Sequence, residues 1–168
     1  INDDETVRNA GRYIQEAGAD AVKLEGGQKM ASTIRRLVDS GIPVMGHVGL
    51  LPQQVYVEGV YRKHGKTQDE AQRIADDAAS LAEAGCFAVV LEGIDFDLAA
   101  RITASVDIPT IGIGAGPDCS GQVQVMHDIL GLFEDFVPKH TKRYATLADD
   151  VRKAIKGYVD DVGDRRFP

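Results

Sequence analysis

The sequence is poor in the residues and patterns that mark several common protein classes. It has two cysteines, no tryptophan, and no apolar run long enough to span a membrane. Cys86 and Cys119 have no companion at metal-ligand spacing, which argues against a zinc site or a disulfide framework. This cysteine usage fits a reducing compartment, and we expect a cytoplasmic protein.

The charge balance is acidic. The chain carries 19 Lys and Arg against 26 Asp and Glu, so its net charge is -7, and its pI is about 5.0. Without a dense basic patch, nucleic acids and anionic membranes would repel it, and we expect neither as a partner. A length of 168 residues with 43% apolar residues is typical of one globular domain, which we predict to cover residues 1–168.

Helical stripes of apolar residues alternate along the chain with short β-branched runs. This alternation is typical of parallel sheets built from βα units. Strands are expected at 19–25, 42–47, 87–92 and 108–113, with a weaker candidate at 135–138. The expected helices have their apolar stripes or caps in the ranges 2–17, 30–38, 67–82, 95–102, 120–131 and 147–162.

An internal repeat sharpens this interpretation. Residues 16–26 and 83–93 are identical at eight of eleven positions, and each copy ends in a Glu-Gly pair. No strand is followed by a dinucleotide-type glycine fingerprint, which disfavours a doubly wound sheet. We therefore predict an α/β fold of the (βα)8 TIM-barrel type, for which about 250 residues are typical. The chain would supply about the last five βα units, with about three leading units absent.

Three polar residues stand where predicted strands give way to glycine-bearing turns: Glu25, His47 and Glu92. The carboxyl ends of parallel strands form the functional rim of such folds. Lys23 lies two residues before Glu25, so both side chains should project from the same face of the strand. Simpler interpretations stay open: a structural ion pair for Lys23 and Glu25, a solvated acid for Glu92, and a capping or core role for His47.

The remaining polar patterns are less specific. A glycine-rich segment at 112–116 could cradle a phosphate on the amides of a following helix. Glycines there could equally let a bulky ligand approach the backbone. We expect structural roles for His127 and His140, and a loop position for His64.

Several short stretches together resemble the ketopantoate hydroxymethyltransferase family, and the similarity extends over essentially the whole chain. They are VKLEGG at 22–27, GHVGLLPQ at 46–53, VLEG at 90–93, IGIGAG at 111–116, GQV at 121–123 and VMHD at 125–128.

The resemblance implies a reaction and a set of residue roles. A one-carbon unit would pass from 5,10-methylenetetrahydrofolate to 3-methyl-2-oxobutanoate through a magnesium-stabilised enolate, giving ketopantoate in the first step of pantothenate synthesis. By resemblance, Glu25 is a Mg²⁺ ligand, Lys23 and His47 contact the oxo acid, and Glu92 is the base. The family also implies a barrel of the phosphoenolpyruvate-mutase and isocitrate-lyase type and a homo-oligomer, usually a decamer. Its leading strands supply further metal ligands, so we expect an isolated 168-residue fragment to be inactive.

Two alternatives remain. One is another Mg²⁺-dependent 2-oxo-acid lyase or mutase on the same barrel, although the chain has no reactive cysteine at a strand end for the lyase version. The other is a truncated, non-catalytic chain that keeps only assembly surfaces. An intact polypeptide mass well above 18.1 kDa would argue against the second.

Overall fold

The computed structural model describes residues 2–54, 59 and 62–168, which form two compact units, Ile1–Val123 and Gln124–Pro168. Whether residues 1–168 behave as one domain stays a prediction. The second unit holds α6 (Met126–Ile129) and α7 (Leu147–Gly163). The first unit holds, in chain order, α1 (Asp3–Gln15), β1 (Val22–Glu25), η1 (Gln28–Met30), α2 (Ala31–Asp39), β2 (Val44–Gly49), η2 (Pro52–Gln54), α4 (Gln68–Glu83), β3 (Ala88–Glu92), α5 (Phe96–Ser105), β4 (Thr110–Ile113) and β5 (Gly121–Gln122).

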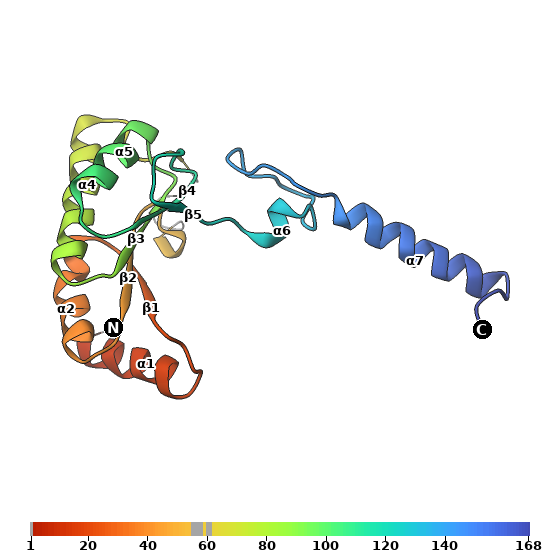
Figure 1. The fold of residues 1–168 in the computed structure, drawn as a ribbon, viewed down its shortest axis with the longest axis horizontal. Helices are drawn as coiled ribbons and strands as arrows, with labels where there is room; N and C mark the ends of the chain where they lie inside the picture. Colours follow the sequence, from red (N-terminus) through yellow and green to blue (C-terminus); the bar gives the residue numbers. More distant parts are fainter. Residues whose placement is uncertain (1, 55–58, 60–61) are drawn as a thin grey trace. The chain divides into compact units, whose positions relative to one another are not determined.

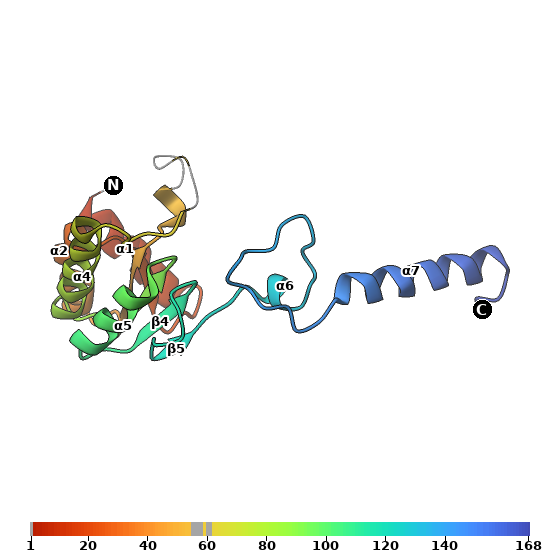
Figure 2. The same ribbon diagram turned by 90° about the horizontal axis from the view of Figure 1, so that it is seen from above.

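The five strands form one parallel sheet in the order β1-β2-β3-β4-β5. A doubly wound sheet would reverse its strand order part-way, whereas a βα barrel keeps the order of the chain. Right-handed crossovers then place the connecting helices on one side of the sheet, where α2, α4 and α5 lie (Figures 1 and 2). The predicted α/β class is confirmed, with the strand order of a barrel wall.

Side-chain caps fix where three helices of the first unit begin: α1, α4 and α5. The Asn2 carboxamide oxygen accepts the Glu5 N–H at 2.8 Å, and the Thr67 hydroxyl accepts the Glu70 N–H at 3.3 Å. Asp95 caps α5 in the same way. Each cap satisfies an N–H that the helix itself leaves unpaired. The predicted starts of these three helices are confirmed.

The core lies between the sheet and its helices. Alternate strand residues face the helices, and Val44, Val89 and Leu91 on that face are fully buried. Gly46 belongs to the same face, where an added Cβ would lie 2.7 Å from the Leu81 side chain, so its lack of a side chain allows α4 to pack closely. The opposite face of the sheet carries the polar side chains of Lys23, Glu25, His47 and Glu92 beside apolar ones such as Met45, Val90 and Ile111. The helix residues with little or no exposure in this core include Ile34, Leu37, Ala78, Leu81, Leu98, Ala99 and Ile102.

The helix expected at 120–131 is wrong over most of its length. Gly121–Gln122 forms β5 beside β4, and the chain becomes helical only at Met126. Ser120 and Thr110 exchange two hydrogen bonds, Thr110 N–H to Ser120 Oγ at 3.2 Å and Ser120 N–H to Thr110 Oγ1 at 3.1 Å. These bonds hold the chain alongside β4 and stabilise an extended conformation there.

The weaker strand candidate at 135–138 is also wrong. These residues are described and have no strand conformation, and the Pro138 carbonyl accepts the Thr141 N–H at 2.9 Å in a turn. Phe136 and Val137 in this segment are both exposed. None of the helices in the described ranges has the length and apolar character needed to cross a bilayer.

Candidate functional site

The register of three neighbouring strands brings the four predicted site residues to one face of the sheet. β2 lies between β1 and β3, and Glu25 pairs with His47. Glu92 pairs with Gly49, which is two residues beyond His47 on β2. Because residues two apart share a face, Lys23, Glu25, His47 and Glu92 all project away from the helices. The predicted constellation is therefore assembled at the carboxyl ends of the strands.

His47 is the centre of the site. It is only 2% exposed, and its two ring nitrogens face different partners. Nδ1 lies 3.0 Å from the Lys23 ammonium and 3.8 Å from Glu25 Oε1. Nε2 lies 3.1 Å from Glu92 Oε2, although the atoms are not aligned for a hydrogen bond. One imidazole thus connects the ends of β1 and β3.

The partner of Nδ1 indicates the tautomer of His47. A lysine ammonium has three donors and no acceptor, so the 3.0 Å contact requires Nδ1 to accept. In the neutral ring the proton then lies on Nε2, the nitrogen that faces Glu92. The sequence left a capping or a core role open for His47. The structure shows no cap among the described residues, because the ring nitrogens face other site residues, but the ring is buried, as a core role requires.

Glu25 is held in place by two neighbours. Its Oε1 lies 3.4 Å from Lys23 Nζ, and its Oε2 accepts the Gln53 N–H at 3.3 Å. The carboxylate is 15% exposed, so it can still reach a ligand in the site. Mg²⁺ commonly takes one or two protein carboxylates and completes its shell with substrate oxygens and water. Glu25 fits that donor chemistry. Within the described parts of the chain, no three His, Cys, Asp or Glu side chains form a fuller ligand group.

The turn after β3 fixes the backbone of Glu92. The Glu92 carbonyl accepts the Leu50 N–H at 2.8 Å, and the Gly93 N–H donates to the Ile113 carbonyl at 2.9 Å. The adjacent strands therefore hold this residue from both sides. Its carboxylate is 21% exposed and lies against His47, so it is neither a freely solvated acid nor a fully buried one.

The glycine-rich segment at 112–116 does not have the geometry of a phosphate cradle. After β4 the chain continues into a turn and β5, and no helix begins until Met126. The glycines serve packing instead: a Cβ at Gly116 would lie 2.8 Å from the ring of Phe96, and one at Gly112 would lie 2.9 Å from Cys119 Sγ. The phosphate interpretation is therefore not supported.

The chain is similar in sequence to known proteins. The sequence model of the ketopantoate hydroxymethyltransferase family matches residues 1–168. The chain belongs to this family. Among its similar relatives are proteins named 3-methyl-2-oxobutanoate hydroxymethyltransferase from Moorella thermoacetica (56% identical, covering 98% of this chain and 61% of the relative), Trichlorobacter lovleyi (57%, 98% and 61%) and Dehalococcoides mccartyi (54%, 100% and 60%). The chain thus spans about 60% of the length of these curated relatives.

This member of the ketopantoate hydroxymethyltransferase family has a second polar cluster, centred on Glu70. The Glu70 carboxylate is 11% exposed and contacts three groups in residues 62–65, just before α4. Arg62 Nη2 donates to Oε1 at 2.6 Å, the Gly65 N–H donates to Oε2 at 2.8 Å, and His64 Nδ1 lies 3.3 Å from Oε1. The one feature of the sequence that pointed to this cluster is the capping-box spacing of Thr67 and Glu70.

The Glu70 cluster should make the stability of this chain sensitive to acid. The hydrogen bond that Glu70 accepts from Arg62, reinforced by the one from the Gly65 N–H, lowers the pKa of Glu70 to about 2 from an ordinary value of 4.5. The ionised Glu70 carboxylate is more favourable in the folded chain than in the unfolded chain. This contribution to stability is fully present above pH 4.5 and disappears as the pH falls toward 2. Because the Arg62 side chain is about half exposed and solvent screens its bond to Glu70, we expect about 1–2 kcal/mol to be lost over that interval.

Urea unfolding of wild type and Glu70→Gln from pH 6 to pH 2 measures this contribution. Both proteins lose stability through their other carboxylates, so the difference between the two unfolding free energies isolates Glu70. That difference should shrink between pH 4.5 and pH 2. A difference that stays constant across the range would mean that Glu70 is not held ionised by its neighbours.

Proposed function

We propose that the full-length protein transfers a hydroxymethyl group from 5,10-methylenetetrahydrofolate to 3-methyl-2-oxobutanoate, giving ketopantoate and tetrahydrofolate. Membership of the family supports this reaction. The observation that carries it is the position of His47 between the carboxylates of Glu25 and Glu92, with Lys23 on the same face. This arrangement offers a cation, an imidazole and two carboxylates to one small oxo acid.

Lys23 and His47 are the residues that would bind the oxo acid. The Lys23 ammonium points two of its three donors toward His47 and Glu25, and its side chain is 44% exposed. A third donor can therefore bind the carboxylate of the substrate in a charge-assisted hydrogen bond. The contact of His47 with the oxo acid rests on the family resemblance, because in this structure its Nε2 is buried and faces Glu92.

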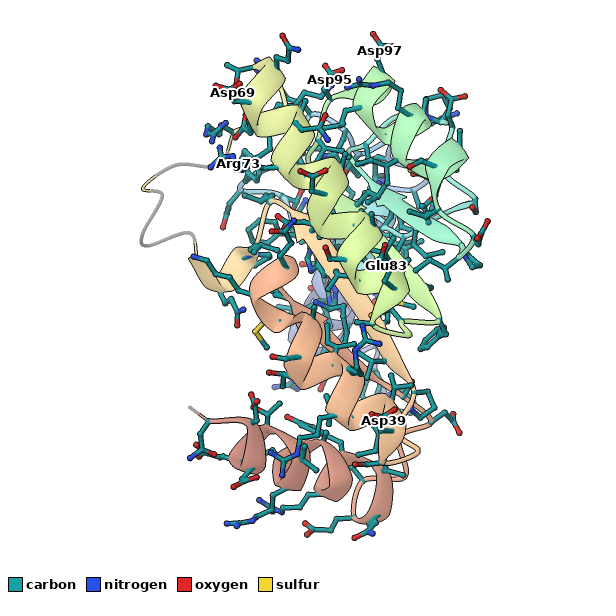
Figure 3. The ribbon with its side chains drawn as sticks, turned by 90° about the vertical axis from the view of Figure 1, so that its left-hand side faces the viewer. Asp39, Asp69, Arg73, Glu83, Asp95 and Asp97 are labelled. Atoms are coloured by element: carbon teal, nitrogen blue, oxygen red, sulfur yellow. The ribbon has the colours of Figure 1, made fainter. Side chains whose placement is uncertain are left out.

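Glu25 is the residue that would hold Mg²⁺. The bound cation would polarise the ketone of the oxo acid and make its C3 proton more acidic. We expect Glu25→Gln to weaken Mg²⁺ binding by at least about tenfold, because loss of even an outer-shell partner commonly costs 10–100-fold in metal affinity. Titration calorimetry of the full-length protein with Mg²⁺ alone measures this without turnover. Glu83→Gln, an exposed carboxylate on α4, is the matched control (Figure 3). Equal affinities in the two variants would remove Glu25 from the metal site.

Glu92 is suited to act as the base. Its carboxylate takes the C3 proton of the oxo acid, and the electron pair of the C–H bond moves into the enolate. Water releases the methylene carbon of the folate at the oxidation level of formaldehyde: both C–N bonds break, and the two water protons go to the folate nitrogens, giving tetrahydrofolate. The enolate carbon then adds to that carbon, and the oxygen bound to it takes up the proton removed from C3, which gives the hydroxymethyl group of ketopantoate. His47 Nε2 lies 3.1 Å from Glu92 Oε2 without an aligned hydrogen bond, so the imidazole packs against the carboxylate and limits its position.

The cysteines count against the lyase alternative on the same barrel. Cys86 precedes β3, is buried, and has a pKa raised to about 11 by that burial, so it carries almost no thiolate at neutral pH. Burial also raises the pKa of Cys119. Neither thiol is therefore prepared for nucleophilic or acid chemistry. Both are free, which supports our proposal of a cytoplasmic location.

The reaction can be tested directly. Full-length protein is incubated with 3-methyl-2-oxobutanoate, 5,10-methylenetetrahydrofolate and Mg²⁺, and ketopantoate is quantified by mass spectrometry. We expect product that requires all three components. Absence of ketopantoate above the enzyme-free background would reject the proposed function.

We further propose that the protein is a homo-oligomer, with a decamer implied by the family resemblance. Support comes from α7, where Val151, Ile155, Tyr158 and Val162 form one apolar stripe and are each about half exposed. Apolar stripes of this kind are commonly covered by another chain or another part of the same chain. Light scattering on the full-length protein measures the assembly mass, and a monomer would contradict the proposal.

A further inference from the structure

The Glu70 cluster lies next to the turn that follows the proposed base. His64, one member of the cluster, forms a parallel bridge with Ile94. Its N–H donates to the Gly93 carbonyl at 2.8 Å, and its carbonyl accepts the Asp95 N–H at 2.9 Å. The backbone of residues 93–95 is therefore bound on one side by the segment that Glu70 holds.

Glu70 holds that segment at several points. Its two carboxylate oxygens bind Arg62 and the Gly65 N–H, and His64 Nδ1 lies 3.3 Å from one of them. Such charge-assisted hydrogen bonds are roughly twice as strong as neutral ones. The Glu70 carboxylate is 11% exposed but the Arg62 side chain is 48% exposed, so solvent screens the Arg62 bond more than the bond from the buried Gly65 N–H. The segment is thereby fastened to the first turn of α4, a 16-residue helix packed on the sheet.

The fastened segment contacts the site through the backbone. Glu92 is joined covalently to Gly93, and Gly93 accepts the His64 N–H while its own N–H donates to Ile113. A shift of residues 62–65 therefore moves the turn from which the Glu92 side chain starts. Placement of a general base matters because a displacement of about 1 Å can reduce a rate by 10²-fold.

We propose that Glu70 is a positioning residue for the base: it fixes the segment 62–65 against the turn after β3 and so sets the place of the Glu92 carboxylate. This inference rests on the proposed function. It assigns Glu70 no contact with substrate, and Glu70 acts only through the backbone of His64 and Gly93.

Three variants of the full-length protein test the role of Glu70. Glu70→Ala removes all of its contacts, and Glu70→Gln keeps its shape and an acceptor but loses the charge. Asp69→Asn is the control, because Asp69 is an exposed carboxylate in the same helical turn (Figure 3). The readouts are the rate of C3 proton exchange of the oxo acid in D2O and the Kd of the oxo acid from calorimetry.

We expect Glu70→Ala to slow proton exchange by 10- to 100-fold while the Kd changes less than about twofold, because Lys23, Glu25 and His47 stay in place. Glu70→Gln should lie between Glu70→Ala and wild type, and Asp69→Asn should match wild type. Exchange at the wild-type rate in both Glu70 variants overturns the inference. A Kd that rises in proportion to the loss of exchange also overturns it, because the whole site would then have been disturbed.

Hydrogen–deuterium exchange of the backbone provides a test that needs no turnover. In Glu70→Gln the Asp95 amide, which donates to His64, should exchange faster than in wild type, whereas the β1 amides should not. Unchanged protection at Asp95 would show that Glu70 does not fix this turn. If wild type itself fails to exchange the C3 proton, the proposed function is wrong, and the backbone measurement still decides whether Glu70 controls the turn.

Discussion

Glu92→Gln should reduce the rate of C3 proton exchange of 3-methyl-2-oxobutanoate in D2O by about 10³-fold. The amide has nearly the same shape as the carboxylate, but it cannot accept a proton at neutral pH. General bases commonly contribute 10²- to 10⁴-fold to a proton transfer. The exchange is followed by proton NMR with the full-length protein, the oxo acid and Mg²⁺. Leaving out the folate confines the measurement to the step assigned to Glu92.

Two controls separate loss of the base from loss of the site. The Kd of the oxo acid should stay close to its wild-type value in Glu92→Gln, because Lys23 and His47 keep their mutual contact. Glu83→Gln, which changes an exposed carboxylate, should exchange at the wild-type rate. Rapid exchange in Glu92→Gln would show that another group removes the proton, and His47 would then be the first residue to replace.

Gly49→Ala should be severely destabilising and should also impair proton exchange. Gly49 has a φ of +96°, where an L side chain is strained, and a Cβ there would overlap the Glu92 carbonyl oxygen and lie 2.5 Å from the Ile94 side chain. Strain of this kind costs about 1–2 kcal/mol, and overpacking a buried site adds about 1–3 kcal/mol. We therefore expect a loss of about 3 kcal/mol in the free energy of unfolding, measured with urea.

Gly41→Ala provides the matched control for Gly49→Ala. Gly41 also has a positive φ, +81°, but an added Cβ would meet nothing within 4 Å. This variant should lose only the backbone term, about 1 kcal/mol, and should keep the wild-type exchange rate. If the two variants proved equally stable, the close approach of β2 to the turn after β3 would not be rigid.

The parts of the fold that could be predicted from the sequence are those with local signals. α1 follows an Asn2 cap, and β1 and β3 lie within the two copies of the internal repeat. β5 could not be predicted in this way, because a strand of two residues is too short to show an alternation of apolar and polar positions. Its position depends on the side-chain bonds between Ser120 and Thr110, which are ten residues apart in the chain.

Part of the site could likewise be predicted from the sequence, and part could not. Alternation along β1 placed Lys23 and Glu25 on one face, and the strand-end rule placed His47 and Glu92 at the same rim, as the structure shows. The Glu70 cluster was not predictable, because its capping-box spacing concerns only the local helix start. Its carboxylate instead binds Arg62 and the Gly65 N–H, and that choice depends on how the preceding segment folds back onto α4.

The strand register has a consequence for how the repeat could have diverged. Both copies end in Glu-Gly, and one neighbouring strand contacts both glutamates through a single histidine. On the shared inner face, the copies differ at one position, which is Lys23 in β1 and Val90 in β3. Replacement of one residue on the face away from the helices is therefore enough to give the two copies of the strand end different chemical environments. In the proposed roles, the copy with Lys23 supplies the metal ligand Glu25, and the copy with Val90 supplies the base Glu92.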